Sequence, residues 1–159
     1  SKGNTIVETG TTRMKDDWGA GSSTILFGDY LKTYGGKLYT VDIEPRNIET
    51  CKEITQEFKE NIEYVVDDSL HFLKGFKDSI DLLYLDSYDF PLDGTPPDAC
   101  QQHQLRELQL SLPKLNGLGI ILLDDNDFPS GGKTKLSKDY LFKTGATCLI
   151  DSQQSLWIL

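Results

Sequence analysis

Carboxylate side chains recur in this sequence at the ends of short apolar runs that are typical of β-strands. A packed core would not select carboxylates, and a group of them suits a bound cation. Asp is also common at turns and helix caps, which explains any single position but not the whole set. The strand-end residues are Glu8 with Gly10, Asp42, Asp67 with Asp68 and Ser69, Asp86, and Asp125 with Asn126. Ligands of open parallel sheets bind at the carboxyl ends of the strands, so these residues predict a ligand site.

The first strand-like stretch, residues 6–10, leads into a glycine turn and then into the start of a helix. Gly10 has no Cβ to obstruct a tight turn or a close ligand. After a polar loop, Gly21, Ser22 and Ser23 indicate a helix N-terminus with Ser at the cap. A strand, a glycine turn and a helix N-terminus together can bind a ligand at the sheet edge.

Strand-like and helix-like segments alternate along the chain, with no internal repeat, low-complexity tract or linker. Strands are predicted at residues 6–10, 38–43, 62–66, 80–85, 118–123, 146–150 and 155–159. Helices are predicted at residues 22–32, 46–59, 98–112 and 134–143, with a short helix from residue 70. The last two strands are joined by a turn too short for a parallel crossover. The sequence therefore predicts one α/β domain over residues 1–159, a doubly wound Rossmann-like sheet of seven mostly parallel strands with an antiparallel C-terminal strand.

The composition argues against several classes of protein. The formal net charge is −9, whereas a nucleic-acid partner needs a basic face. No apolar run approaches the roughly 20 residues that span a membrane. The three cysteines are widely spaced without a C-x-x-C pair, which favours a reducing, cytoplasmic location over a disulfide framework or zinc knuckle. Ser1 stands almost at the first strand, which leaves room for a natural N-terminal segment beyond this sequence.

These motifs resemble those of a class I S-adenosylmethionine-dependent methyltransferase over nearly the whole chain. In that family an acidic residue and a glycine lie beside the methionine part of the cofactor, an acid after the second strand holds both ribose hydroxyls, and a segment after the third strand lies beside the adenine. The resemblance, with the helix start above, implies these cofactor-binding residues: Glu8, Gly10, Thr11, Gly21, Ser22, Ser23, Asp42, Ile43, Asp67, Asp68, Ser69 and Asp86. The family's glycine loop is usually shorter, so we expect residues 11–19 to bulge over the cofactor or the acceptor.

A narrower resemblance is to the catechol O-methyltransferase-like branch, which depends on a divalent metal. Its fourth strand ends in a ligand Asp and its fifth in Leu-Leu-x-Asp-Asn, so the resemblance assigns Asp86, Asp125 and Asn126 as ligands of Mg²⁺ or Mn²⁺. Mg²⁺ prefers a few carboxylate or amide oxygens and keeps its other positions for water and substrate. The alternative is a cluster of helix-capping acids. In that branch a lysine three residues after the fourth-strand Asp acts as the base, and here that position is Asp89.

The sequence thus predicts methyl transfer to a hydroxyl of a small-molecule acceptor, with no nucleic-acid or membrane partner. The predicted catalytic residues are Asp86, through the metal, and Asp89 and Lys133, either of which could assist proton removal or be a solvated loop charge. His71 and His103 are expected on a helix surface and beside a loop rather than in catalysis. The acceptor and the oligomeric state are not predicted.

Two alternatives belong to other classes. A nicotinamide-dependent oxidoreductase also places an acid after the second strand, but it normally needs G-x-G-x-x-G directly after the first, and Thr11 and Thr12 break that pattern after Gly10. A non-catalytic nucleotide-binding domain could have kept the fold. The acids at every strand end weigh against it.

Overall fold

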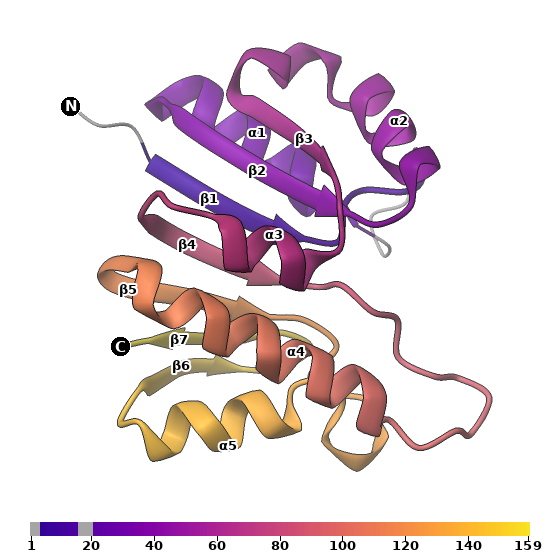
Figure 1. Cartoon of the computed structure of the whole chain (residues 1–159), viewed down its shortest axis with the longest axis vertical. Helices are drawn as coiled ribbons and strands as arrows, with labels where there is room; N and C mark the ends of the chain where they lie inside the picture. The colour runs from indigo at the N-terminus through magenta and orange to yellow at the C-terminus, as the bar shows by residue number, and fades with distance from the viewer. Residues whose placement is uncertain (1–3, 16–20) are drawn as a thin grey trace.

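The computed structural model describes residues 4–15 and 21–159 of the chain, which form one seven-stranded sheet in the order β3-β2-β1-β4-β5-β7-β6 (Figure 1). The strands are β1 Asn4–Thr9, β2 Gly36–Asp42, β3 Ile62–Val66, β4 Ile80–Leu85, β5 Leu115–Leu123, β6 Thr147–Asp151 and β7 Ser155–Ile158. β1 to β5 are parallel to their neighbours among themselves, and β7 is antiparallel to both β5 and β6. The predicted fold class is therefore confirmed.

Helices cover both faces of this sheet (Figure 1). They are α1 Ser23–Tyr34, α2 Pro45–Ile54, α3 Ser69–Gly75, α4 Asp98–Ser111 and α5 Lys135–Lys143, with 3₁₀ turns η1 Gln56–Asn61, η2 Leu112–Lys114 and η3 Pro129–Gly131. α3, α4 and α5 pack side by side on one face, while α1 and α2 pack with η1 on the other. No helix among the described residues has the length and apolar character needed to cross a bilayer.

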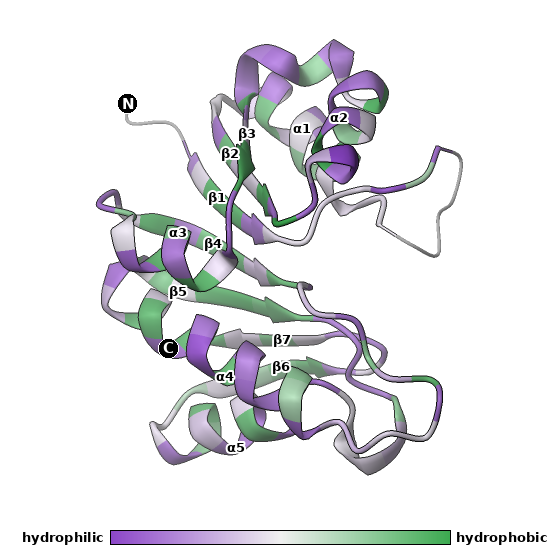
Figure 2. Cartoon of the chain, turned by 45° about the vertical axis from the view of Figure 1, so that its right-hand side comes forward, coloured by the Kyte–Doolittle hydropathy of each residue, from purple (hydrophilic) through white to green (hydrophobic). Residues whose placement is uncertain are grey.

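The core has one part on each face of the sheet, because successive strand residues point to opposite sides. Ile6 packs with Leu31 of α1, whereas the next residue, Val7, packs with Leu83 and with Leu108 of α4. Figure 2 shows the hydrophobic residues concentrated along the central strands β4 and β5. Because these strands are buried on both faces, their sequences are nearly continuous apolar runs.

The helix that the sequence predicts over residues 46–59 ends early, at Ile54. The Thr55 hydroxyl donates to the Cys51 carbonyl oxygen at 2.7 Å, the same oxygen that accepts the Thr55 backbone N–H at 2.9 Å. Such a side-chain bond competes with helix continuation. The chain proceeds as η1, which brings Phe58 into the core beneath α1.

The strand order reverses between β2 and β4, which both pair with β1. Chain connections leave the sheet in opposite directions at this point, and a crevice opens at the carboxyl ends of the strands. The predicted strand-end acids therefore converge on one edge of the molecule.

Leu83→Ala should test the larger part of the core. Leu83 lies in β4 with no exposed surface, so we expect the cavity to lower the free energy of unfolding by about 3 kcal/mol. Chemical denaturation measures this. The control Leu149→Ala removes an exposed leucine from the edge strand β6 and should change stability by less than about 0.5 kcal/mol. Equal losses in the two variants would contradict the placement of the core.

Candidate functional site

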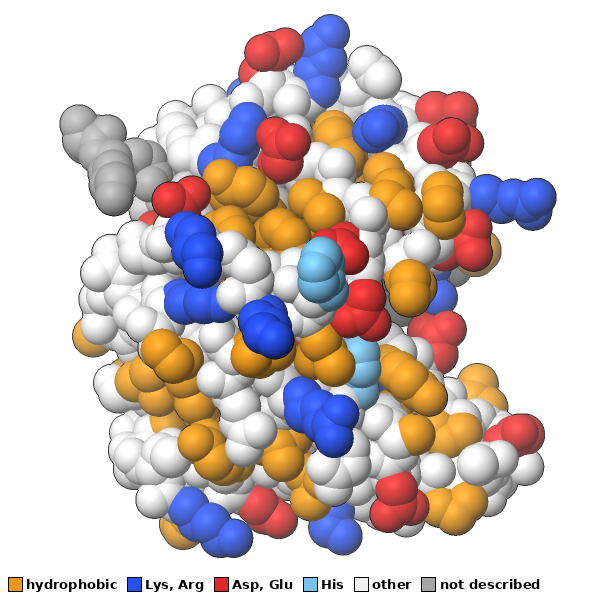
Figure 3. Space-filling model, in the orientation of Figure 1, with side chains coloured by type: hydrophobic (Ala, Val, Ile, Leu, Met, Phe, Trp, Pro, Cys, Tyr) orange, Lys and Arg blue, Asp and Glu red, His pale blue; other side chains and the backbone are white. Residues whose placement is uncertain are grey.

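A cavity of about 840 Å³ lies at the carboxyl ends of β1 to β5, a volume suited to a cofactor or another small ligand. Acidic side chains and histidines border the hollow on the face shown in Figure 3. Among the predicted site residues, those lining the cavity are Gly10, Thr11, Gly21, Asp42, Ile43, Asp67, Asp68, Ser69, Asp86, Asp89 and Asp125. Those that do not line it are Glu8, Ser22, Ser23, Asn126 and Lys133. Ser22 and Ser23 instead line a smaller neighbouring hollow that Gly21 also borders.

The turn at Gly10 is fixed by its contact with the end of β4. Gly10 has a φ of 82°, and a Cβ on it would lie 2.6 Å from the carbonyl oxygen of Asp86. Its N–H donates to the carbonyl oxygen of Val41 at 2.8 Å. Only glycine fits here without displacing the backbone, so the turn holds the ends of three strands together.

Glu8 lies beneath this turn and has no exposed surface. Its carboxylate accepts hydrogen bonds from Ser23 at the start of α1, from Thr24 at 2.7 Å and from Thr40 of β2 at 2.7 Å. Burial raises its pKa from 4.5 to about 7, although the three hydroxyl donors act in the opposite direction. Glu8 therefore joins β1, β2 and α1 below the cavity and does not reach a ligand in it.

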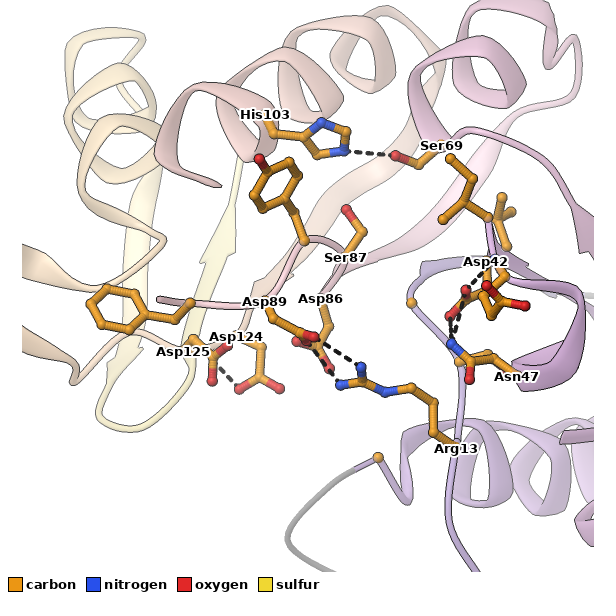
Figure 4. A pocket seen from close by; sticks show the side chains of 18 of the residues that line it. Arg13, Asp42, Asn47, Ser69, Asp86, Ser87, Asp89, His103, Asp124 and Asp125 are labelled. Atoms are coloured by element: carbon orange, nitrogen blue, oxygen red, sulfur yellow. Dashed lines mark hydrogen bonds and ion pairs between the residues drawn. The ribbon is translucent and has the colours of Figure 1, made fainter. Parts of the chain in front are cut away.

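Asp42 ends β2 at the cavity wall. Its carboxylate accepts from the backbone N–H of Glu44 at 2.8 Å and from Nδ2 of Asn47 at 3.1 and 3.2 Å (Figure 4). These donors orient the carboxylate and leave acceptor capacity toward the cavity. Ile43 beside it is 69% exposed and offers an apolar surface at the same wall.

The segment after β3 both caps α3 and lines the cavity. Asp68 accepts from the backbone N–H of His71 at 3.0 Å as the N-cap of α3, and Asp67 contacts His71 Nδ1 at 2.7 Å. Asp68 therefore has a helix-capping role, in addition to its place on the cavity wall. His71 lies on the helix surface as predicted, whereas Ser69 turns toward α4.

His103 lies in α4, lines the cavity and packs against Tyr88 of the loop after β4, so it lies beside a loop as predicted. Its Nε2 lies 2.9 Å from Ser69 Oγ (Figure 4). The same nitrogen lies 3.4 Å from Glu107 Oε1. Ser87, after β4, donates to the same Glu107 oxygen at 2.5 Å. Sequence reasoning missed this network. A signal that could have found it is the pair of polar residues Gln104 and Glu107, three positions apart on the predicted helix and both buried in the structure.

Lys133 lies between the ends of β4 and β5 and is only 1% exposed. Its Nζ donates to Asp86 Oδ1 at 2.9 Å and lies 2.8 Å from Asp125 Oδ2. Burial alone would lower the pKa of Lys133, but Asp86 and Asp125 together raise it to about 12. Burial raises the pKa of Asp86 to about 7, against the opposing effect of the Lys133 ammonium. Lys133 is therefore a buried cation and not a solvated loop charge.

The residues present do not fit the predicted magnesium site. The Lys133 ammonium lies between the two carboxylates that were to bind the ion, and Asn126 points elsewhere. Asn126 Nδ2 donates to Asp151 at 2.7 Å and its Oδ1 accepts from Thr134 at 2.7 Å. Within residues 4–15 and 21–159, no three His, Cys, Asp or Glu side chains are grouped to hold a metal.

Adjacent residues of a strand point to opposite faces, yet Asp124 and Asp125 both line the cavity. Asp125 has a φ of 55°, so the chain has already turned out of the strand there. The Asp125 backbone N–H donates to Asp124 Oδ1 at 2.8 Å, and Tyr84 donates to the other oxygen at 2.5 Å. The alternation that holds along a strand therefore ends at Asp124.

Asp89 forms an ion pair with Arg13, a residue that the sequence analysis did not predict in the site. The guanidinium donates to both carboxylate oxygens at 3.0 and 3.1 Å, across the cavity mouth (Figure 4). Arg13 holds the pKa of Asp89 below its ordinary value. The rest of the predicted bulge, residues 16–19, lies outside the described residues.

The cavity also has an aromatic wall. The rings of Phe90 and Phe128 stack with centroids 4.7 Å apart and planes 8° from parallel, and Tyr88 lies against His103. Both phenylalanines line the cavity near Asp125. A flat or apolar ligand could pack against this wall while polar groups face the carboxylates.

Comparison with known proteins agrees with this geometry. The profile of a family described as a methyltransferase domain matches residues 17–126. The fold is similar to PaMTH1 of Podospora anserina, an SAH-bound methyltransferase, with a TM-score of 0.68, 14% identity, and coverage of 98% of this chain and 70% of that one. A search of curated proteins by sequence finds no match.

Two further solved structures share the fold. The O-methyltransferase of Bacillus cereus, in complex with SAH, has a TM-score of 0.64 and 15% identity, covering 99% of this chain and 74% of that one. SMU.1697c, a protein of Streptococcus mutans that is also in complex with SAH, has a TM-score of 0.66 and 11% identity. The match covers 99% of this chain and 89% of that one. The fold is that of the class I S-adenosylmethionine-dependent methyltransferases. The chain belongs to the methyltransferase-domain family. This confirms the predicted class of S-adenosylmethionine-dependent methyltransferases, but not the narrower metal-dependent branch.

Glu8→Gln should change how stability depends on pH. The folded pKa of about 7 lies above the ordinary 4.5, so the folded protein keeps a proton that the unfolded chain releases. That contribution is complete below pH 4.5 and is lost as pH rises to about 7. We expect the free energy of unfolding of the wild type to fall by about 3 kcal/mol more than that of the variant across this window.

Urea unfolding at several pH values measures this difference. Glu49→Gln, which removes an exposed carboxylate from α2, should keep the wild-type dependence on pH. Parallel curves for the wild type and Glu8→Gln would show that the Glu8 carboxyl is not perturbed.

Proposed function

We propose that this domain transfers a methyl group from S-adenosylmethionine to a hydroxyl of a small molecule. Membership in a methyltransferase family supports the reaction, and the cavity at the reversal of strand order supports the cofactor. The SAH complexes of the PaMTH1 and Bacillus cereus proteins support the same cofactor for this fold. We take oxygen as the acceptor atom because the Asp86 carboxylate lines the cavity and can accept the proton of a hydroxyl.

The observation that carries the proposal is the position of Asp42. Its carboxylate ends β2, lines the cavity beside the Gly10 turn, and is oriented by Asn47. A carboxylate held in this way can accept both ribose hydroxyls of an adenosine, in two charge-assisted hydrogen bonds. The adenine would then extend toward Ser69 and the methionine part toward Gly10.

The charge of the cavity separates the methyltransferase from a nicotinamide-dependent oxidoreductase. Its described lining includes eight acidic residues and one arginine: Asp42, Glu44, Asp67, Asp68, Asp86, Asp89, Asp124 and Asp125, with Arg13. This wall suits a cationic sulfonium and would repel the diphosphate of a dinucleotide. It also supports a small-molecule acceptor in place of a nucleic acid, whose backbone needs basic residues.

The reaction is an in-line displacement in which the acceptor oxygen, the methyl carbon and the sulfur align. The oxygen–methyl bond forms, the sulfur–methyl bond breaks with its electron pair on sulfur, and the acceptor proton leaves to a base. The protein contributes mainly orientation. Metal assistance has no supporting arrangement among the described residues, and the proposal does not use it.

Asp86 is the best placed of the three predicted catalytic residues to receive that proton. It lines the cavity, and only one of its oxygens bonds Lys133. Both oxygens of Asp89 are bonded to Arg13, while Lys133 has no surface on the cavity. A general base must reach the acceptor hydroxyl, and this geometry favours Asp86.

Asp42→Ala tests the proposed cofactor site. Loss of two charge-assisted hydrogen bonds should weaken SAH binding by about 1.5–3 kcal/mol, with the fold intact. Calorimetric titration with SAH measures the affinity, and titration of the wild type with NAD should give no binding. The control Asp78→Ala removes an exposed aspartate just before β4, at the opposite edge of the sheet. An unchanged affinity in folded Asp42→Ala would exclude the ribose assignment.

A further inference from the structure

The buried ammonium of Lys133, directly behind the cavity wall, has no role in the proposed reaction. Its Nζ has three acceptors: Asp86 Oδ1 at 2.9 Å, Asp125 Oδ2 at 2.8 Å and the carbonyl oxygen of Ser87 at 3.3 Å. An ammonium group has three protons, so these acceptors use all of its donors. Lys133 therefore has no donor left for a ligand and lies behind the two carboxylates that line the cavity.

The chain is folded specifically to bring this lysine inside. Gly132 has a φ of 61°, and a Cβ on it would lie 2.0 Å from the carbonyl oxygen of Asp125. The same oxygen accepts the Lys133 backbone N–H at 3.0 Å. Gln101 of α4 fixes the turn by donating to the carbonyl oxygen of Gly132 at 2.8 Å. A surface lysine swinging inward would need none of these contacts.

The charges at this point require a cation. Asp86, Asp124 and Asp125 line the same part of the cavity, and carboxylates at close range repel one another without a counterion. Asp124 is satisfied by Tyr84 and by a backbone N–H. Asp86 and Asp125 depend on Lys133, which supplies one fixed positive charge between them.

We propose that the Lys133 ammonium is the resident cation of this site, holding Asp86 and Asp125 where a divalent ion would otherwise hold them. Lys133 is then a positioning residue, and this role rests on the proposed methyltransferase function. With no open coordination position, the acceptor is bound by the one hydrogen bond that its hydroxyl donates to a carboxylate oxygen. The site accordingly takes an acceptor with a single hydroxyl and has no requirement for two adjacent oxygens that chelate a metal.

Thermal unfolding with Mg²⁺, Mn²⁺ or a chelator tests the proposal directly. The melting temperature of the wild type should not respond to any of them. Lys133→Ala vacates a space between two carboxylates, so it should melt lower and gain about 3 °C or more when Mn²⁺ is roughly tenfold above its dissociation constant. Adding Asp125→Asn to Lys133→Ala should abolish this gain. If Lys133 only stabilised the fold, the Lys133→Ala variant would melt lower but would not be stabilised by Mn²⁺.

The matched control is Lys138→Ala, which removes a lysine of α5 from its ion pair with Asp151, 2.5 Å away, and should gain no metal response. Stabilisation of the wild type by Mg²⁺ or Mn²⁺, reversed by a chelator, would overturn the proposal even if Lys133→Ala does not fold. A folded Lys133→Ala variant indifferent to both ions would overturn it as well. Titration of the wild type with SAH tests the methyltransferase function separately, because it does not depend on the metal response.

Discussion

The close approach of Gly10 to the backbone of Asp86 is the constraint on which the site depends. A Cβ at Gly10 would lie 2.6 Å from the Asp86 carbonyl oxygen, so the ends of β1 and β4 meet only because this residue is glycine. Glu8 supports the same turn from below through hydroxyls of α1 and β2. The turn fixes the level at which Asp42 and Asp86 leave the sheet, and hence the distance between the proposed cofactor and acceptor sites.

The architecture could be predicted because it depends on local signals. Apolar runs of five or six residues separated by helical stretches specify a parallel sheet, and parallel strands end at the same edge. The acids after β2, β3, β4 and β5 therefore had to converge, and Asp42, Asp67, Asp86 and Asp125 do line one cavity. The acidic character of this cavity followed from residue types and strand ends alone.

The directions of individual side chains could not be predicted in the same way. Asp125 and Asp124 both face the cavity because Asp125 has a φ of 55°. No pattern in the sequence predicts this backbone conformation. Asn126 consequently points to Asp151 and away from Asp86. Arg13 and Lys133 find partners 76 and 47 residues away, pairings that only the folded chain defines. The predicted metal ligands were correct in their strand ends but not in their arrangement.

The carboxylates at this edge are stabilised by different partners, and the difference separates their roles. Glu8 is buried among hydroxyls, Asp86 and Asp125 share an ammonium, and Asp89 is bonded to a guanidinium. Asp42 alone in this comparison is oriented by neutral amide donors, so its full negative charge remains available to a ligand. On the proposed function, this acidic wall attracts the cationic sulfonium of the cofactor. Methyl transfer removes that positive charge, so the product is held less strongly and can be exchanged for fresh cofactor.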